Sequence, residues 1–218
     1  MPAASYTKGL TWLGHASFRL ARGGVTIYFD PWQIPTAPHD ADLILITHPH
    51  FDHLSPADVL KVAKPDTAIV TVEGCRAKLK MAGVPGTIQV VKPGDKLTVK
   101  GVPIEAVPAY NRTKTFHLKE NRWVGFVVEV DQTRIYHAGD TDLIPEMKGI
   151  QADVALLPVS GTYVMTAEEA AQAAKLISAK VVVPMHYGSI VGTAADAQRF
   201  QKLCEGLIVE VLKRGEER

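Results

Sequence analysis

The stretch Thr47-His48-Pro49-His50-Phe51-Asp52-His53 is the part of the sequence that decides the fold. It places four potential metal-binding side chains within six residues, directly after the apolar run Leu43-Ile44-Leu45-Ile46. In α/β proteins, a strand that runs into such a polar loop presents a reactive site at the carboxyl edge of a sheet. Imidazole and carboxylate suit Zn²⁺, Mn²⁺ or iron, and the loop lacks the thiolates of a closed structural zinc site. The stretch therefore predicts a metal site.

The spacing within this stretch suggests two binding positions. His48 and His50 are two residues apart, so in an extended chain they point to the same side. Asp52 and His53 follow where the chain turns, and they can face a second position. The alternative is a polar loop that happens to be rich in histidine. That alternative suits a single histidine, but it does not explain four ligands beside a strand.

Length and composition indicate one globular domain. The chain has 218 residues, of which 46% are hydrophobic, and no linker or shift in composition divides it. We expect a single domain over residues 1–218 with a core from about 9 to 212. The formal net charge is only +1 and no basic cluster occurs, which argues against nucleic acid as a partner.

The same features favour a cytoplasmic protein. The N-terminus lacks the apolar segment of a secretory signal, and no apolar run reaches the ~18 residues that span a membrane. Cys75 and Cys204 have no paired spacing, so each is expected to be a buried, reduced thiol. The charged tail, residues 213–218, is expected to fray.

The order of predicted elements is strand-rich first and alternates between strand and helix later. Strands are expected at 10–13, 17–20, 25–29, 43–46, 68–72, 88–91, 96–99, 102–107, 123–130, 134–137, 154–157, 181–183 and 207–212. Helices are expected at 56–62, 75–81, 166–177 and 194–204. Ser55 and Thr166 are good N-caps, the latter in a capping box with Glu169, and Gly83 is a reasonable C-cap. Two sheets packed face to face, with helices outside, would account for this order.

Further ligand candidates follow other predicted strands. Asp140 comes just past residues 134–137, after a glycine that permits close approach, and His186 comes just past residues 181–183. Alone, Asp140 could be a turn residue and His186 a core histidine. Their matching positions, in a chain that already carries the His/Asp stretch, predict that both belong to the site. His15 interrupts the first hairpin and could be either a pocket residue or a turn residue.

These motifs resemble the metallo-β-lactamase superfamily. The resemblance rests on residues 48–53, on Gly139-Asp140-Thr141-Asp142 and on Pro184-Met185-His186-Tyr187. Gly14-His15-Ala16-Ser17 and Phe29-Asp30-Pro31 are similar to a branch that holds metal-dependent hydrolases of the UPF0173 type, ascorbate-6-phosphate lactonases and N-acylphosphatidylethanolamine phospholipase D. The resemblance spans about residues 9–205.

The resemblance implies an αββα sandwich, of mixed α/β class, with one or two metal ions at the edge of the sheets. His48 and His50 would bind the first metal, while Asp52, His53 and His186 would bind the second. Asp140 would bridge them. Two cations about 3.5–4 Å apart can activate a water and polarise the carbonyl or phosphoryl oxygen that it attacks. Hydrolysis is expected to depend above all on Asp52 and His53.

The sequence departs from the family pattern at the third histidine of the first metal. The strand expected at 102–107 ends in Pro108-Ala109-Tyr110-Asn111, without a histidine. His117, further along the same loop, could return as a ligand or contact substrate. Tyr110 or Asn111 could contribute oxygen instead, or a water could fill the place. A site with one metal is therefore an alternative to a site with two.

Other polar residues have two interpretations each. Asp142 could accept a hydrogen bond from the N–H of a metal-bound histidine, or it could cap a turn. Tyr187 and Lys114 could donate to a transition state. His39 and His137 are expected to be structural.

The function predicted from the sequence is a metal-dependent hydrolase acting on an ester, lactone, amide or phosphodiester of a small molecule. The cofactors expected are one or two divalent ions, Zn²⁺ or Mn²⁺ ahead of iron or nickel. Two alternatives stay open: an iron-dependent redox enzyme of the same fold, and a metal-binding regulatory protein without catalysis. The loops 110–121 and 159–163 are expected to border the pocket, and a homo-oligomer is compatible with the sequence.

Overall fold

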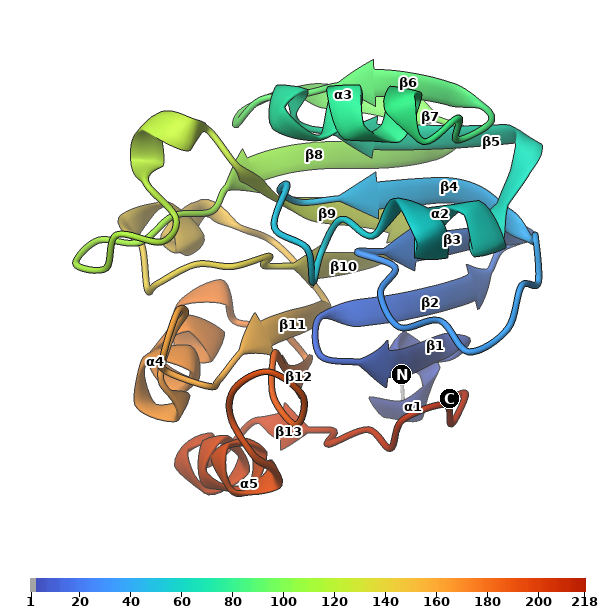
Figure 1. Cartoon of the computed structure of the whole chain (residues 1–218). Helices are drawn as coiled ribbons and strands as arrows, with labels where there is room; N and C mark the ends of the chain where they lie inside the picture. Colours follow the sequence, from blue (N-terminus) through green and yellow to red (C-terminus); the bar gives the residue numbers. More distant parts are fainter. Residues whose placement is uncertain (1–2) are drawn as a thin grey trace.

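Two β-sheets face each other in the computed structural model, which describes residues 3–218 (Figure 1). The first sheet holds, in spatial order, β1 (Leu10–Gly14), β2 (Ser17–Arg22), β3 (Val25–Phe29), β4 (Ala41–Ile46), β5 (Ala63–Thr71) and β6 (Thr87–Val90). The second holds β13 (Ile208–Val209), β12 (Val181–Met185), β11 (Val154–Pro158), β10 (Thr133–His137), β9 (Val124–Val130), β8 (Val102–Pro108) and β7 (Lys96–Val99).

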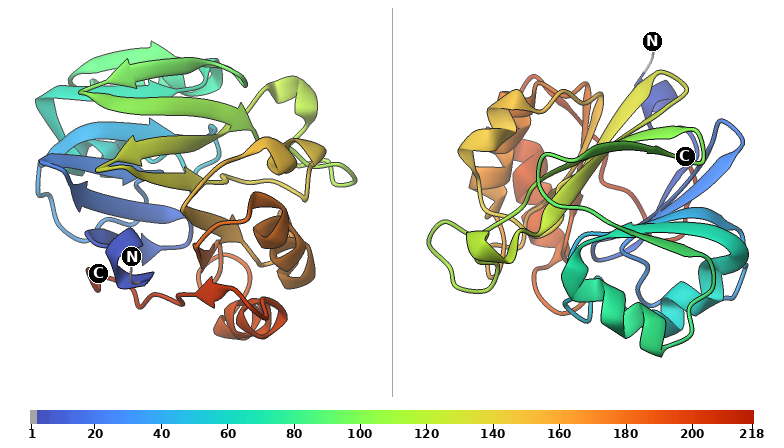
Figure 2. Two further views of the ribbon diagram at one scale, coloured as in Figure 1. Left: turned by 180° about the vertical axis from the view of Figure 1, so that it is seen from behind. Right: turned by 90° about the horizontal axis from the view of Figure 1, so that it is seen from above.

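Helices cover the outer faces of both sheets, so the predicted αββα sandwich is confirmed. The view from above in Figure 2 shows α2 (Pro56–Val62) and α3 (Glu73–Met81) outside the first sheet. The same view shows α4 (Ala167–Ile177) and α5 (Ala194–Leu203) outside the second. No helix in residues 3–218 is long and apolar enough to cross a membrane.

Each sheet begins as an antiparallel meander and ends in parallel pairs. β1, β2 and β3 are antiparallel, whereas β3 to β6 pair in parallel. The crossover from β4 to β5 contains α2, and the crossover from β5 to β6 contains α3. In the second sheet β7 to β10 are antiparallel and β10 to β13 are parallel. Parallel strands covered on both faces need continuous apolar sequence. This is why Leu43–Ile46 and all five residues of β11 are buried.

Local signals place the helices where the sequence predicts them. Ser55 caps α2 and accepts a hydrogen bond from the backbone N–H of Asp58. Thr166 and Glu169 form both hydrogen bonds of the capping box at the start of α4. Such a cap contributes about 1 kcal/mol to helix stability. Gly83, with φ of +67°, lies one residue beyond the C-cap of α3. Cys75 and Cys204 are buried and unpaired, as predicted.

The prediction that the tail frays is wrong. The backbone N–H groups of Gly215 and Arg218 donate to the carbonyls of Trp12 and Leu10, at 2.8 and 3.1 Å. The tail therefore lies along β1, the outer strand of the first sheet, and satisfies an edge that would otherwise be open. The strand predicted at 207–212 is correspondingly short, because only Ile208 and Val209 pair with β12 before the chain leaves for β1.

Three short helices were not predicted from the sequence. They are α1 (Ala3–Tyr6) and the two 3-10 turns η1 (Lys119–Asn121) and η2 (Pro145–Gly149). The loops that follow β4, β8, β10 and β12 all reach the same edge of the sandwich, on the left of Figure 1. The topology thus brings the His/Asp stretch, the loop that contains His117, and the predicted Asp140 and His186 to one place.

Candidate metal centre

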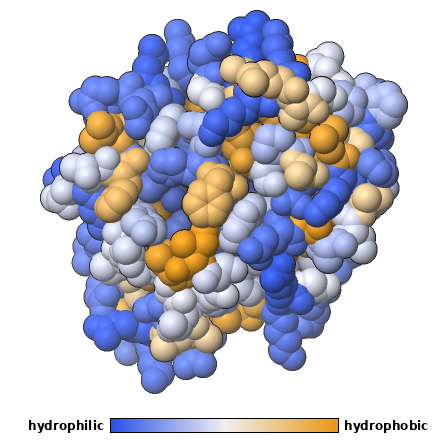
Figure 3. All heavy atoms as spheres, viewed as in Figure 1, coloured by the Kyte–Doolittle hydropathy of each residue, from blue (hydrophilic) through white to orange (hydrophobic). Residues whose placement is uncertain are grey.

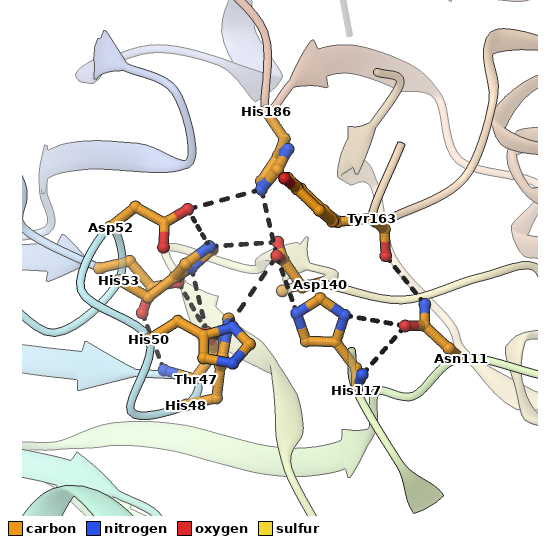
Figure 4. Close-up of polar contacts among 12 residues, drawn as sticks. Thr47, His48, His50, Asp52, His53, Asn111, His117, Asp140, Tyr163 and His186 are labelled. Carbon is orange, nitrogen blue, oxygen red and sulfur yellow. Dashed lines mark hydrogen bonds and ion pairs between the residues drawn. The ribbon is translucent and has the colours of Figure 1, made fainter. Parts of the chain in front are cut away.

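Eight histidine and aspartate side chains converge at this edge (Figure 4). They form two groups, in each of which the potential ligand atoms all lie within 4.8 Å of one another. The first group is His48, His50, His117 and Asp140. The second group is His15, Asp52, His53 and His186. All are buried except His50, which is half-buried.

Asp140 connects the two groups. Its Oδ2 lies 3.1 Å from Nε2 of His117, in the first group, and 3.1 Å from Nε2 of His186, in the second. Its Oδ1 lies 3.2 Å from Nε2 of His53, also in the second group. A single buried carboxylate thus faces both positions, which is the geometry that a bridging ligand requires.

The distances within the groups fit a divalent cation. Two ligand atoms, each about 2.0–2.1 Å from one zinc ion, lie roughly 2.9–3.4 Å apart at angles of about 90–110°. In the first group Nε2 of His48 lies 3.1 Å from Nδ1 of His50. In the second group Oδ2 of Asp52 lies 3.0 Å from Nε2 of His15 and 3.4 Å from Nε2 of His53.

Asp30 and Thr47 orient two of the histidines. Nδ1 of His53 donates to Oδ2 of Asp30 at 2.7 Å, because a carboxylate only accepts. The Thr47 hydroxyl donates to the same carboxylate oxygen and therefore accepts from Nδ1 of His48, at 2.9 Å. Both rings are thus held with Nε2 free and aimed into the cluster. Metal-binding histidines characteristically have their other nitrogen held in this way.

Asn111 and Ser160 hold the two histidines that come from elsewhere in the chain. Oδ1 of Asn111 accepts from both the backbone N–H and Nδ1 of His117, each at 3.0 Å. The Ser160 hydroxyl lies 3.1 Å from Nδ1 of His186. In both rings Nε2 again points toward Asp140.

Several atoms at the centre of the cluster are buried without a hydrogen-bond partner in residues 3–218. They are Nδ1 of His15, Oδ1 of Asp140, and Nε2 of His53, His117 and His186. Leaving one such group unsatisfied costs about 1–3 kcal/mol. The unsatisfied Nε2 atoms of His53, His117 and His186 all lie 3.1–3.2 Å from the Asp140 carboxylate. Such a convergence of ligand atoms is what a metal-binding cluster offers, so the residues fit the cations that the sequence predicts.

The electrostatics of the cluster also favour a cation. Burial alone would lower the pKa of His53, yet Asp140, Asp30 and Asp52 together raise that pKa well above its usual value. Burial would raise the pKa of Asp140, but His186 and His53 hold it well below its usual value. The Asp140 carboxylate is therefore ionised and favours positive charge at the centre. Burial, followed by the charge of His53, lowers the pKa of His48, which keeps that ring neutral as a ligand must be.

The backbone around the site is strained in ways that few residues tolerate. His15, Asp30 and His186 have φ values of +53°, +43° and +61°. Left-handed conformations of non-glycine residues occur preferentially at functional sites, where the surrounding structure imposes them. Gly139 has φ of +62°, and a Cβ there would lie 3.0 Å from the carbonyl oxygen of Val124. The predicted close approach at Gly139 is present.

The structure brings His15 and His117 into the site but directs Tyr110 elsewhere. The Tyr110 hydroxyl donates to Glu146 at 2.9 Å and lies 3.3 Å from the Lys119 amino group, so it faces no ligand. The Asn111 amide is fully used: besides its two bonds to His117, it donates to Oδ1 of Asp142 and to the Tyr163 carbonyl.

Asp142 touches no histidine of the cluster through a direct hydrogen bond. Its carboxylate accepts from Asn111, from the backbone of Arg112 and from Lys114. It therefore acts on His117 through the Asn111 amide, and Lys114 is engaged in holding Asp142. The Tyr187 ring stacks on Trp12 with centroids 4.9 Å apart, and burial raises the pKa of Tyr187 to about 12.

The two histidines expected to be structural lie outside both groups. Nε2 of His137 donates to the carbonyl of Ala16 at 2.8 Å, and the ring stacks on Phe29. Nδ1 of His39 lies 3.0 Å from the carbonyl of Ala63.

Sequence reasoning did not assign Asp30, Thr47 or Ser160 to the site. One signal was available for Asp30, which follows a buried strand just as Asp140 does. Ser160 lies in one of the loops expected to border the pocket, 159–163, but nothing in its sequence indicates a contact with His186. The contacts of Asp30 and Ser160 depend on which strands are neighbours.

A cavity of about 260 Å³ opens directly on the cluster. Its floor is formed by His50, Asp52, His117 and Asp140, and its walls by Phe51, Phe116, Tyr163 and Ile190. Figure 3 shows that apolar side chains are exposed near the centre of this face. A larger hollow of about 580 Å³, lined in part by Lys8, Arg22 and Asp131, contains none of the cluster.

Comparisons with known proteins identify the family to which the chain is similar. Residues 9–186 match the model of the β-lactamase superfamily domain. A protein of Methanopyrus kandleri named "UPF0173 metal-dependent hydrolase" is 34% identical, with 93% of this chain and 95% of that one covered. A namesake from Methanoregula boonei is 39% identical, covering 90% and 89%. The solved structure of a novel metallo hydrolase from Ignicoccus hospitalis superposes with a TM-score of 0.79, at 29% identity and 96% coverage of both chains.

Proposed function

Since the chain belongs to the metallo-β-lactamase superfamily, in its branch of metal-dependent hydrolases, we propose that it hydrolyses an ester, lactone, amide or phosphodiester with a metal-activated water. The observation that carries this proposal is the orientation of four histidines. His48, His53, His117 and His186 each have Nδ1 beside an oxygen of a neighbouring side chain and direct Nε2 into one buried cluster with Asp140.

In this proposal the two groups hold two cations. His48, His50 and His117 bind the first, and Asp52, His53 and His186 bind the second. Asp140 lies between them, in contact with both groups. The family's third histidine is supplied by His117, so the loop after β8 completes the first position from further along the chain. His15 joins the second position through Nε2, beside Asp52.

The chain's own residues prepare the reaction. When bound, the cations lower the pKa of a water and polarise the carbonyl or phosphoryl oxygen under attack. Asp140 sets the spacing of the two positions, and Asp30 fixes the ring of His53. Asp52 belongs both to the second group and to the floor of the cavity, so we assign it the role of accepting a proton from the attacking water.

Zn²⁺ and Mn²⁺ are the cations that this donor set favours, since six of the eight groups are imidazoles and no thiolate is present. A cytoplasmic location is part of the proposal, supported by two buried thiols that are not paired. The substrate is proposed to be a small molecule, because the cavity holds only about 260 Å³.

Metal analysis and a substrate screen test the proposal together. The full chain, purified without added metal and then loaded with Zn²⁺ or Mn²⁺, is assayed against 4-nitrophenyl esters, lactones and bis-(4-nitrophenyl) phosphate. We expect two equivalents of metal and measurable turnover. Asp52→Ala and His53→Ala should abolish turnover while circular dichroism shows an intact fold. His39→Ala is the matched control, because His39 lies outside both groups.

The outcomes separate the alternatives. Turnover that survives both Asp52→Ala and His53→Ala would refute the assigned roles. Stoichiometric metal binding without turnover of any substrate would favour the regulatory alternative. Redox-active iron in the protein as purified would favour the redox enzyme.

A further inference from the structure

We propose that the enzyme selects uncharged acyl substrates that carry a small hydrocarbon group, and that it rejects substrates with an anionic group at that position. The inference rests on the proposed hydrolytic function and deepens it by naming the substrate class. It is carried by the walls of the cavity beside the metal centre rather than by the metal ligands themselves.

The walls are built from apolar side chains that no packing requirement explains. Phe51 and Phe116 are 66% and 47% exposed, whereas the other four phenylalanines of the chain are fully buried. Ile190 is 41% exposed and lines the same cavity. Exposed apolar groups that gather around one opening typically mark a binding site. The exposed phenylalanines of this chain thus lie where a substrate would shield them from water.

The aromatic wall is arranged to receive a hydrocarbon group. The rings of Phe116 and Tyr163 meet edge to face, with centroids 4.7 Å apart and planes at 77°. The ring of Phe51 contacts that of Trp32 edge to face, with centroids 6.3 Å apart. The cavity of about 260 Å³ has the volume of roughly nine water molecules at about 30 Å³ each, which is enough for a short hydrocarbon group.

The charges around the cavity exclude an anionic group. Of the described residues that line it, none is a lysine or arginine. The nearby Lys114 and Lys119 are engaged by Asp142 and Glu146. A carboxylate or phosphate placed between Phe116 and Ile190 would lose hydration without gaining a partner, which is costly. The polar end of the substrate therefore lies at the floor, beside Asp52 and Asp140, and the apolar end lies against the walls.

The reaction follows from this orientation. The oxygen of water bonds to the acyl carbon on the cavity floor, the acyl C–O or C–N bond breaks, and a proton is transferred to the leaving group. The products are a carboxylic acid, whose hydrocarbon chain occupies the cavity, and an alcohol or amine. Monocarboxylates are thus product analogues, and they report the selectivity of the walls without turnover.

Binding of three carboxylates to the metal-loaded full chain, by calorimetry, tests the inference. Acetate, hexanoate and adipate share the head group but differ in the tail, which is short, apolar or anionic. A buried methylene contributes about fourfold in affinity, so hexanoate should bind roughly 10- to 100-fold more tightly than acetate in a partly open cavity. Adipate should bind no more tightly than acetate.

Two variants locate the selectivity. Phe116→Ala should reduce the preference for hexanoate over acetate to a few-fold, and Ile190→Lys should raise the affinity for adipate above that for hexanoate. Met81→Ala is the matched control, since Met81 is 88% exposed on α3, is absent from the cavity lining and should leave both ratios unchanged. If Phe116→Ala fails to fold, Ile190→Lys decides alone.

Kinetics with 4-nitrophenyl acetate and hexanoate separate this inference from the proposed function. Selective binding of hexanoate without any hydrolysis would overturn the hydrolase and leave the cavity's selectivity standing. Hydrolysis with equal kcat/KM for both esters, and equal affinity for acetate and hexanoate, would overturn the selectivity alone. A dimer that Phe116→Ala dissociates would assign the apolar walls to a subunit interface and overturn it as well.

Discussion

Replacing Asn111 by leucine should weaken one of the two metal positions and spare the other. Leucine has the same branched side-chain shape as asparagine but can form none of its hydrogen bonds. Oδ1 of Asn111 accepts two hydrogen bonds from His117, and the Asn111 amide nitrogen donates to Asp142 and to the carbonyl of Tyr163. Without Asn111 the imidazole of His117 can rotate, and its Nε2 no longer faces Asp140 reliably.

The magnitude follows from the groups left behind. The substitution leaves three groups without partners: the buried backbone N–H and Nδ1–H of His117, and the part-buried carbonyl of Tyr163. Asp142 keeps its bond to Lys114. At about 1 kcal/mol for each unsatisfied group, the free energy of unfolding should fall by about 3 kcal/mol. Loss of a partner that orients a metal-bound histidine typically lowers metal affinity by about 10- to 100-fold.

Competition with a chromogenic chelator measures the two affinities separately. In Asn111→Leu we expect one equivalent to weaken by about 10- to 100-fold and the other to stay within about twofold of its original affinity. Asn111→Asp is the informative partner variant, because its carboxylate still accepts from His117 but loses both amide donors. It should keep the metal affinity while losing stability. Unchanged affinity for both equivalents in a folded Asn111→Leu protein would refute the role given to this loop.

Three further predictions concern residues around the cluster and the cations themselves. Asp30→Asn places an amide where Thr47 and His53 both donate hydrogen bonds. We expect urea titration to show a loss of about 1–3 kcal/mol in the free energy of unfolding, together with weaker metal binding. Unaltered stability would contradict this prediction. Gly139→Ala places a Cβ 3.0 Å from the Val124 carbonyl oxygen, at a residue with positive φ. Denaturant unfolding should therefore show a loss of about 1–3 kcal/mol in the free energy of unfolding. An unchanged free energy of unfolding would mean that the loop relaxes freely. Chelation should lower Tm, because free metal at about 100 times Kd adds about 2.7 kcal/mol of stability. This stabilisation corresponds to a Tm shift of roughly 5–10 °C for a chain of this length, and added Zn²⁺ should reverse the shift. The same Tm with and without metal would contradict the prediction.

The strands and the ligand-bearing loops could be predicted from sequence because their signals are local. Leu43–Ile46 is a continuous apolar run, which is typical of a parallel strand buried on both faces. Thr166 and Glu169 form a capping box within four residues. Asp140 and His186 follow buried strands directly, so an edge-of-sheet position could be inferred from sequence order alone.

The remainder of the site depends on contacts between distant segments. Asp30 acts on His53 because β3 pairs with β4, with Phe29 opposite Leu45, and this pairing sets Asp30 beside Thr47. Nothing near Asp30 in the sequence specifies that neighbour. The tail failed as a prediction for the same reason, since its charged composition suggests fraying while the open edge of β1 offers it backbone partners.

The positions of His15 and His117 also depend on contacts that cannot be predicted from spacing along the chain. His15 reaches the second group because its carbonyl accepts from the backbone N–H of His186, which lies at the far end of the other sheet. His117 reaches the first group because the loop closes on itself: the N–H of Asn111 donates to the carbonyl of His117 at 2.7 Å. Spacing along the chain fixes neither contact, so the sequence could offer both residues only as candidates.

The loop after β8 therefore both lines the cavity and supplies a metal ligand, two functions that the sequence alone does not connect. Phe116 forms part of the apolar wall, and the next residue, His117, is the third histidine of the first metal position in our proposal. Asn111 joins the two sides of the cavity as well, because its amide donates to the carbonyl of Tyr163, whose ring packs against Phe116. A change in this loop that reshapes the wall also moves a metal ligand. Substrate range and metal occupancy in this protein should consequently vary together, and selectivity variants at Phe116 have to be compared at equal metal content.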